Sequence, residues 1–164
     1  MSKSTFRLLS YTWGIPMTLI GRLAALILTA LGFKHESYGY CTRFEVGENW
    51  GGVSLGDVII TGKNSTTHTK DHEHGHALQN VKYGLLMPFV VAIPSFLRYW
   101  YFVIKIKLNK RITKSYDSIW FEGEATKLGT EFMDWYRGNS ATFSIPYSVM
   151  ITVNKNNEEN NDQN

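Results

Sequence analysis

The chain has 164 residues, which is enough for one domain with a hydrophobic core and too few for two ordinary domains. Its composition is globular, with 43% hydrophobic and 19% charged residues, and a net charge of +3 without any nucleic-acid motif gives no reason to expect nucleic acid as a partner. Cys41 is the single cysteine, so an intramolecular disulfide and a cysteine-ligated zinc site are both excluded.

The longest apolar run extends from Gly14 to Phe33 and is long enough to cross a bilayer. Trp13 precedes it, as aromatic residues often do at a membrane interface. Arg22, near the middle, is unfavourable in lipid unless it reaches the interface or a partner. We interpret residues 1–34 as an N-terminal membrane-anchor helix. The alternatives are a cleaved signal peptide and a buried or interfacial helix of a soluble domain.

Two stretches rich in β-branched or aromatic residues, Tyr40–Val46 and Val53–Thr61, predict strands. The sequence Gly-Glu-Asn-Trp-Gly-Gly separates them and predicts a turn. A short β-hairpin should therefore open the main domain, which we place at 35–150. The tail at 151–164 is rich in Asn and Glu and is expected to be disordered.

The most informative segment is His72-Glu73-His74-Gly75-His76, which has the pattern H-E-x-x-H. On a helix, positions 72 and 76 lie one turn apart on the same face, so both imidazoles can bind one metal ion. Glu73 lies beside them, where its carboxylate can act on a water at that metal. The competing interpretation is a polar helix start or adventitious metal binding that also involves His68. The apolar residues after His76 favour a buried helix, where imidazoles need partners.

A second apolar stretch, Gly84–Ile104, contains Pro88 and Pro94, each of which removes a helical hydrogen bond. If it spanned a membrane, the residues before and after it would lie about 30 Å apart. Because we expect residues on both sides to share one metal, we interpret it as a proline-broken loop and helix that lies in or on the membrane or caps the site. The basic run Lys105–Lys114 would suit an anionic lipid surface, and an ordinary solvated loop explains it equally well.

A catalytic zinc normally has three protein ligands, so a third is needed beside the two histidines. A second helix is predicted to begin at Asp117-Ser118 and to end before Gly138. No histidine follows position 76, so the candidates on this helix are the carboxylates Glu122, Glu124, Glu131 and Asp134. The face of Glu122 carries small residues that permit close approach of another helix, whereas the face of Glu124 is bulky or charged. Geometry therefore favours Glu122 without excluding the others.

The pair of motifs His72-Glu73-x-x-His76 and Glu122-Gly-Glu-Ala resembles the gluzincin metallopeptidases. In that family HExxH supplies two zinc ligands, and a downstream Glu, often in the context E-x-x-A-D, supplies the third. The resemblance implies Zn²⁺ held by His72, His76 and Glu122, with Glu73 as the general base. Thr126 stands where many members have Asp, so the usual contact of that Asp to the site is not implied.

From Tyr11 through Gly129 the chain is also similar to small bacterial membrane-associated proteins of uncharacterised activity. They share an N-terminal apolar helix, a G-E-N-W-G-G turn and an I-P-S loop. The histidine helix is similar to that of the site-2 proteases as well, but no L-D-G-type ligand motif accompanies it.

We therefore expect an α+β fold in which the HExxH helix packs on the helix that carries the third ligand. The expected function is a zinc peptidase at the bacterial cell membrane, with a single-pass anchor, a site facing the cytoplasm, and peptide or protein substrates. A strand around Val53–Ile60 could pair with an extended substrate. The alternatives are a non-catalytic metal-binding protein, a metal-free membrane or interaction protein, and a hydrolase of lipids or amides. The sequence leaves open the cleavage preference, the oligomeric state and the donor to the oxyanion.

Overall fold

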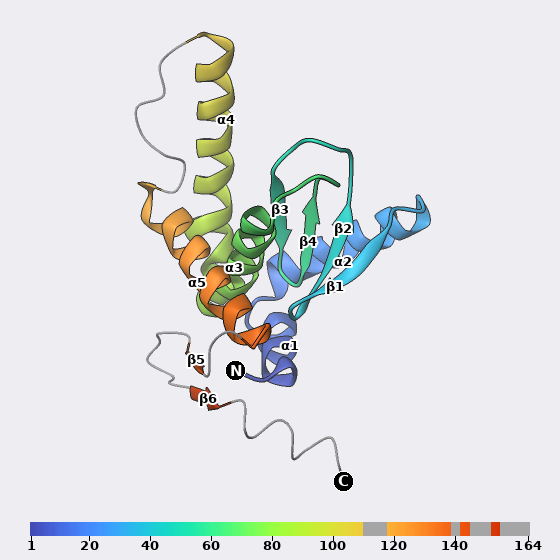
Figure 1. Cartoon of the computed structure of the whole chain (residues 1–164), viewed down its shortest axis with the longest axis vertical. Helices are drawn as coiled ribbons and strands as arrows, with labels where there is room; N and C mark the ends of the chain where they lie inside the picture. The colour runs from blue at the N-terminus through green and yellow to red at the C-terminus, as the bar shows by residue number, and fades with distance from the viewer. Residues whose placement is uncertain (110–117, 139–141, 145–151, 155–164) are drawn as a thin grey trace.

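The computed structural model describes residues 1–109, 118–138, 142–144 and 152–154. Helices and strands alternate only in part, which gives the α+β fold that the sequence predicts. The sheet contacts both α2 and α3, and α3 packs in turn against α5 (Figure 1). The α-helices are α1 Lys3–Tyr11, α2 Ile15–Ala30, α3 Thr67–Tyr83, α4 Ile93–Lys107 and α5 Trp120–Tyr136.

The main sheet has four strands in the order β1-β2-β4-β3. One antiparallel hairpin joins β1 to β2, a second joins β3 to β4, and β2 runs parallel to β4. The strands are β1 His35–Tyr38, β2 Cys41–Glu45, β3 Gly52–Leu55 and β4 Val58–Thr61. The prediction of one hairpin across the Gly-Glu-Asn-Trp-Gly-Gly turn is therefore wrong. That segment instead carries the chain from β2 past the central strand β4 to the outer strand β3.

The predicted strand Val53–Thr61 is divided by a two-residue turn at Gly56-Asp57. Leu55 pairs with Val58, and Gly56 has a positive φ of 65°, which a glycine adopts without strain. A Cβ at Gly56 would lie 2.4 Å from the Cα of Thr18, so the turn also lets α2 pack closely on the sheet. A further pair of short strands, β5 Thr142–Ser144 and β6 Thr152–Asn154, follows α5. β6 falls within the predicted tail, whose other residues lie outside the described ones.

The N-terminal apolar run forms a helix that packs on the domain along one side. α2 has 16 residues and is about 24 Å long, and it meets α1 at an angle of 98°. Met17, Thr18 and Gly21 are buried, and the Asn80 side chain of α3 donates to the Thr18 hydroxyl. Arg22 forms an ion pair with Asp57. The cation that is unfavourable in lipid therefore has a protein partner, and crossing of a membrane by α2 stays a prediction.

The second apolar segment is helical throughout. A 3-10 turn, Gly84–Leu86, and a π-helical turn, Pro88–Ala92, lead into α4, which projects beyond the sheet (Figure 1). Pro88 begins the π-helical turn, whereas Pro94 lies inside the continuous helix Pro88–Lys107. The N–H that Pro94 lacks removes a helical hydrogen bond where the π-helical turn passes into α4. The predicted break is thus a change of helix type. By length and apolarity, Pro88–Lys107 is the one helix in the described ranges that could cross a membrane by itself.

Candidate metal centre

Close packing of α3 on α5 places the predicted metal ligands together. A Cβ at Gly75 of α3 would lie 1.8 Å from the Ala125 carbonyl oxygen, and a Cβ at Gly129 of α5 would lie 1.8 Å from the Asp71 carbonyl oxygen. Only glycine fits at both contacts. The two backbones can therefore approach closely enough for Glu122 to reach the histidine face of α3.

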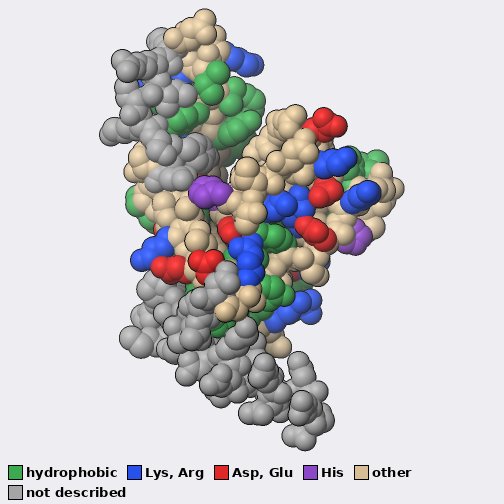
Figure 2. Space-filling view, viewed as in Figure 1, with side chains coloured by type: hydrophobic (Ala, Val, Ile, Leu, Met, Phe, Trp, Pro, Cys, Tyr) green, Lys and Arg blue, Asp and Glu red, His purple; other side chains and the backbone are tan. Residues whose placement is uncertain are grey.

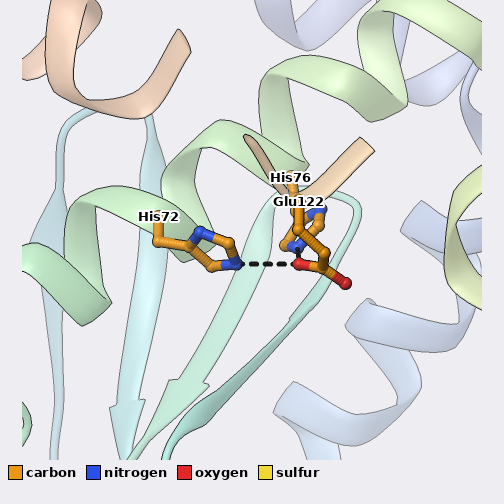
Figure 3. Close-up of side chains that lie close together, drawn as sticks. All are labelled: His72, His76 and Glu122. Carbon is orange, nitrogen blue, oxygen red and sulfur yellow. Dashed lines mark hydrogen bonds and ion pairs between the residues drawn. The ribbon is translucent and has the colours of Figure 1, made fainter. Parts of the chain in front are cut away.

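His72, His76 and Glu122 converge on one point (Figure 3). The Nε2 atoms of both histidines lie 3.2 Å from Oε2 of Glu122, and the three ligand atoms all lie within 4.8 Å of one another. A tetrahedral site with bonds of about 2.0–2.1 Å has ligand–ligand distances of roughly 3.4 Å. Two imidazoles and one carboxylate at this spacing fit a divalent transition metal, and the donor set by itself does not single out zinc.

The ring orientation of His76 is fixed by Gln79. His76 Nδ1 lies 2.8 Å from Gln79 Oε1, and the Gln79 amide nitrogen donates to the Phe121 carbonyl at 2.8 Å and to Glu124 at 2.9 Å. Because the Gln79 oxygen only accepts, Nδ1 of His76 must carry the proton. Nε2 faces Oε2 of Glu122 at 3.2 Å, and a metal bound there would take the place of the Nε2 proton that forms this hydrogen bond.

His72 has a corresponding partner on α5. Its Nδ1 lies 2.8 Å from the Thr126 hydroxyl. The partner of this ring nitrogen on α5 is therefore a hydroxyl. The hydroxyl can accept the Nδ1 proton and leave Nε2 of His72 free to bind metal.

Glu122 is buried and ionised. Burial opposes its charge, but hydrogen bonds with His72 and His76 outweigh this effect and hold the pKa of the carboxyl below its ordinary value. Ser95, at the base of α4, donates a hydrogen bond of 2.5 Å to Oε1 of Glu122. The apolar segment is therefore connected directly to the candidate third ligand.

Glu73 lies next to the candidate ligands, and its pKa is shifted in the opposite direction to that of Glu122. Its side chain is buried, and no described residue hydrogen-bonds to Oε2. Burial raises the pKa of Glu73, a change that the charge of Glu122 reinforces and the two histidines oppose. A buried carboxylate oxygen without a protein partner is costly. Its position on the wall of a cavity beside the ligands suits a group that accepts a proton from a reactant.

A cavity of about 700 Å³ adjoins the three ligands and Glu73. One wall is β3 with the preceding residues from Trp50, and another is α4, through Ser95, Phe96, Tyr99 and Trp100. Gly52 packs so closely on Glu73 that a Cβ there would lie 2.6 Å from the Glu73 Cγ. The outer strand of the described sheet therefore runs directly beside the candidate base.

The other candidate ligands lie away from this point. Glu124 accepts hydrogen bonds from Gln79, Lys82 and the Tyr83 hydroxyl. Glu131 is exposed and lies 3.9 Å from Lys127, while His68 lines the cavity without joining the ligand group. Of the carboxylates on this helix, Glu122 is the one that groups with the two histidines in the described residues.

Two contributors were not recognised from the sequence, Gln79 and Ser95. Gln79 follows His76 by three residues on the same helix, so its spacing gave a usable signal. Ser95 reaches Glu122 across 27 positions, and nothing in its local sequence points to that contact.

Comparisons with protein-family models, curated proteins and solved structures found no match to this chain. The likeness to gluzincins stays a prediction drawn from the two motifs. Function is therefore inferred from the ligand geometry, Glu73 and the cavity.

Proposed function

We propose that the protein is a membrane-associated zinc-dependent peptidase, with His72, His76 and Glu122 as ligands and Glu73 as the general base. The observation that carries this proposal is the buried Glu73 Oε2, which has no hydrogen-bond partner among the described residues and lies on the cavity wall beside the ligand group. A purely structural zinc site has four protein ligands and no need of a base. In the described residues the group contains three.

When bound, the metal would supply a Lewis acid that activates water and polarises the scissile carbonyl. Glu73 accepts the proton of the attacking water and delivers it to the leaving amine. Gln79 and Thr126 hold the histidine rings in the tautomer that directs Nε2 inward. Ser95 holds the second oxygen of Glu122 and so fixes the orientation of that carboxylate.

A peptide is the substrate that best suits the cavity wall. β3 pairs with β4 along one side only and is the outer strand of the described sheet, so its other side can pair with an extended chain. Of the predicted substrate-pairing stretch Val53–Ile60, only Val53–Leu55 lies on this outer strand. Val58–Thr61 is the central strand and pairs on both sides.

Membrane association is proposed from the exposed apolar surface of the helices. α4 has no buried residue, and the segment Pro88–Lys107 is apolar enough to enter lipid. On α2, Leu19, Leu23 and Leu26 are exposed on the side that faces away from the sheet. Soluble monomers rarely expose apolar surface of this extent.

The test is the substitution Glu73→Gln in the full chain, purified in detergent and loaded with one zinc. The expected result is retained zinc and a loss of peptide cleavage of about 10²-fold or more, as for removal of a general base. Backbone N-methylation of the peptide at single positions should lower cleavage where the amide pairs with β3. Equal cleavage by the wild type and Glu73→Gln, or cleavage by neither while zinc is held, would reject the peptidase and favour a non-catalytic metal protein.

A further inference from the structure

Three aromatic side chains of α4 lie where the cavity meets the outer surface. Phe96, Tyr99 and Trp100 line the cavity and are 60%, 51% and 46% exposed. A residue that lines a cavity while half of its surface is open stands at the mouth of that cavity. The entrance on the α4 side is therefore aromatic.

The cavity beyond this mouth is apolar away from the ligands. Met17 of α2 and Met87 and Val91 of the turns before α4 belong to one buried cluster and also line the cavity. Leu55 of β3 packs against them. Polar side chains of a bound molecule would find few partners here, whereas apolar side chains would be removed from water at no such cost.

The mouth is continuous with the exposed apolar surface. Leu85, Leu86 and Phe89 are 49%, 56% and 69% exposed in the turns that join α3 to α4. Gly84 packs against the Trp13 ring, which connects these turns to the start of α2. Figure 2 shows hydrophobic side chains gathered over α4 on the same molecule. The surface that would contact lipid thus extends to the edge of the cavity.

Although Pro88–Lys107 is long enough to cross a bilayer, the contacts at its two ends favour an α4 that lies at the membrane surface. At the start of α4, the Ser95 hydroxyl donates a hydrogen bond to Glu122. Ser118, which precedes α5, accepts a hydrogen bond of 3.1 Å from Arg98 in the first half of α4. Ser95 and Ser118, at the two ends of this segment, therefore both lie on the side of the metal site. Tyr and Trp in the middle of α4, with Lys105 and Lys107 in its last turn, are typical of a helix that lies in the interface.

We propose that the substrate is an extended apolar peptide segment that enters from the lipid surface between α4 and β3. This inference rests on the proposed peptidase function and names its substrate class. The backbone of the segment pairs with the open side of β3, and its apolar side chains contact Phe96, Tyr99 and Trp100. The β3 edge selects a peptide over a lipid chain, because an acyl chain has no backbone groups to pair.

The test uses the zinc-loaded full chain bound to vesicles of phosphatidylcholine and phosphatidylglycerol. The probes are two peptides of equal length, one with Leu and Phe around the scissile bond and one with Ser and Gln, each linked to a palmitoyl chain. Tyr99→Ser is compared with Tyr101→Ser. The two tyrosines are 51% and 52% exposed and lie two residues apart on α4, but only Tyr99 lines the cavity.

The expected result is a kcat/KM for the apolar peptide at least about tenfold above that for the polar peptide, since burial of one large apolar side chain is worth about this factor or more. Tyr99→Ser should remove most of this preference. Tyr101→Ser should keep it, although both variants bind vesicles equally. Equal cleavage of both peptides, or equal loss in both variants, would overturn the inference while leaving the peptidase intact.

If neither peptide is cleaved although zinc is bound, the proposed peptidase function is rejected. The proposed site for an apolar peptide is then tested by peptide binding alone. The zinc-loaded Glu73→Gln variant is then titrated with the same lipid-linked peptides. Tighter binding of the apolar peptide that depends on Tyr99 and not on Tyr101 would support the apolar peptide site. Equal binding of the two peptides, or displacement of the apolar peptide by palmitate alone, would overturn it.

Discussion

Gly75 of α3 and Ala125 of α5 are in direct backbone contact, because a Cβ at position 75 would lie 1.8 Å from the Ala125 carbonyl oxygen. His72 and His76 flank Gly75 on α3, and Glu122 lies one turn before Ala125. The glycine contact therefore sets how closely Glu122 approaches the two histidines, so the candidate metal centre depends on a residue that carries no ligand atom.

Gly75→Ala should force α3 and α5 apart. Overpacking of this kind costs on the order of 1–3 kcal/mol or more in the free energy of unfolding, and the shift should also weaken zinc binding. Chemical denaturation and a chelator competition would measure the two effects. Gly51→Ala is the matched control, since a Cβ at Gly51 meets no atom within 4 Å. Equal stability of the two variants would show that the helices are not in contact at this point.

Thr126→Val keeps the shape of the side chain and removes the hydroxyl that lies 2.8 Å from His72 Nδ1. Loss of such a partner behind a ligating histidine is expected to lower metal affinity about 10–100-fold. Thr126→Ser should retain the affinity, and Thr126→Asp should match or exceed the wild type. Zinc titration against a chromophoric chelator measures all three. Wild-type affinity in Thr126→Val would mean that the hydroxyl does not orient His72.

We expect His74 to lower the free energy of unfolding as the pH becomes acidic. It is fully buried, stacks on Phe132 at 4.3 Å, and accepts a hydrogen bond from the Tyr40 amide at 3.2 Å. Burial, aided by the charge of Arg137, lowers the pKa of His74 from 6.5 to about 3. The His74 side chain binds a proton more readily in the unfolded chain than in the folded protein. Its contribution to the free energy of unfolding is therefore fully present above pH 6.5 and is lost as the pH falls toward 3.

The substitution His74→Gln removes this titration and retains an acceptor for Tyr40. The free energy of unfolding, measured against pH in urea, should fall less steeply in the variant, by up to about 1.4 kcal/mol per pH unit below pH 6.5. The difference between the two proteins isolates His74 from the carboxylates, which titrate in both. Parallel curves would show that His74 is accessible to protons in the folded state.

Arg22→Leu tests the packing of α2 on the sheet. Asp57, whose side chain is 2% exposed, would lose its cationic partner, and the Tyr11 hydroxyl at 3.2 Å would be the remaining side-chain partner among the described residues. Because Arg22 is partly exposed, the expected loss of stability is on the order of 2 kcal/mol, below the value for a fully buried pair. Arg7→Leu, which removes an exposed cation of α1, should have little effect in the same detergent-based unfolding experiment. If α2 lay in lipid without contacting the sheet, Arg22→Leu would instead leave the stability unchanged or raise it.

The grouping of His72, His76 and Glu122 was more predictable from the sequence than the sheet was. The i, i+4 spacing of His72 and His76 fixes their common face whatever surrounds the helix, and small residues on α5 marked the side of Glu122. The sheet depends on Gly56, which divides an apparently continuous strand, and on the parallel pairing of β2 with β4 between segments that are not consecutive.

The start of α5 and the packing of α2 were also not predictable from local sequence patterns. α5 begins at Trp120 with Ile119 as its cap, and no capping hydrogen bond comes from a side chain, so the cap expected from Ser118 is wrong. Asp117, the other expected cap, lies outside the described residues. Arg22 finds Asp57 across 35 positions, and no local pattern reveals that pair.

Zinc content per chain is the most direct test of the central claim, measured in protein purified without added metal for the wild type, Glu122→Ala and Glu124→Ala. The two glutamates are two residues apart on α5, but only Glu122 faces the histidines. We expect about one zinc per chain in the wild type and in Glu124→Ala, and a large loss in Glu122→Ala. Zinc retained by Glu122→Ala, or absent from all three proteins, would contradict a zinc centre formed by His72, His76 and Glu122.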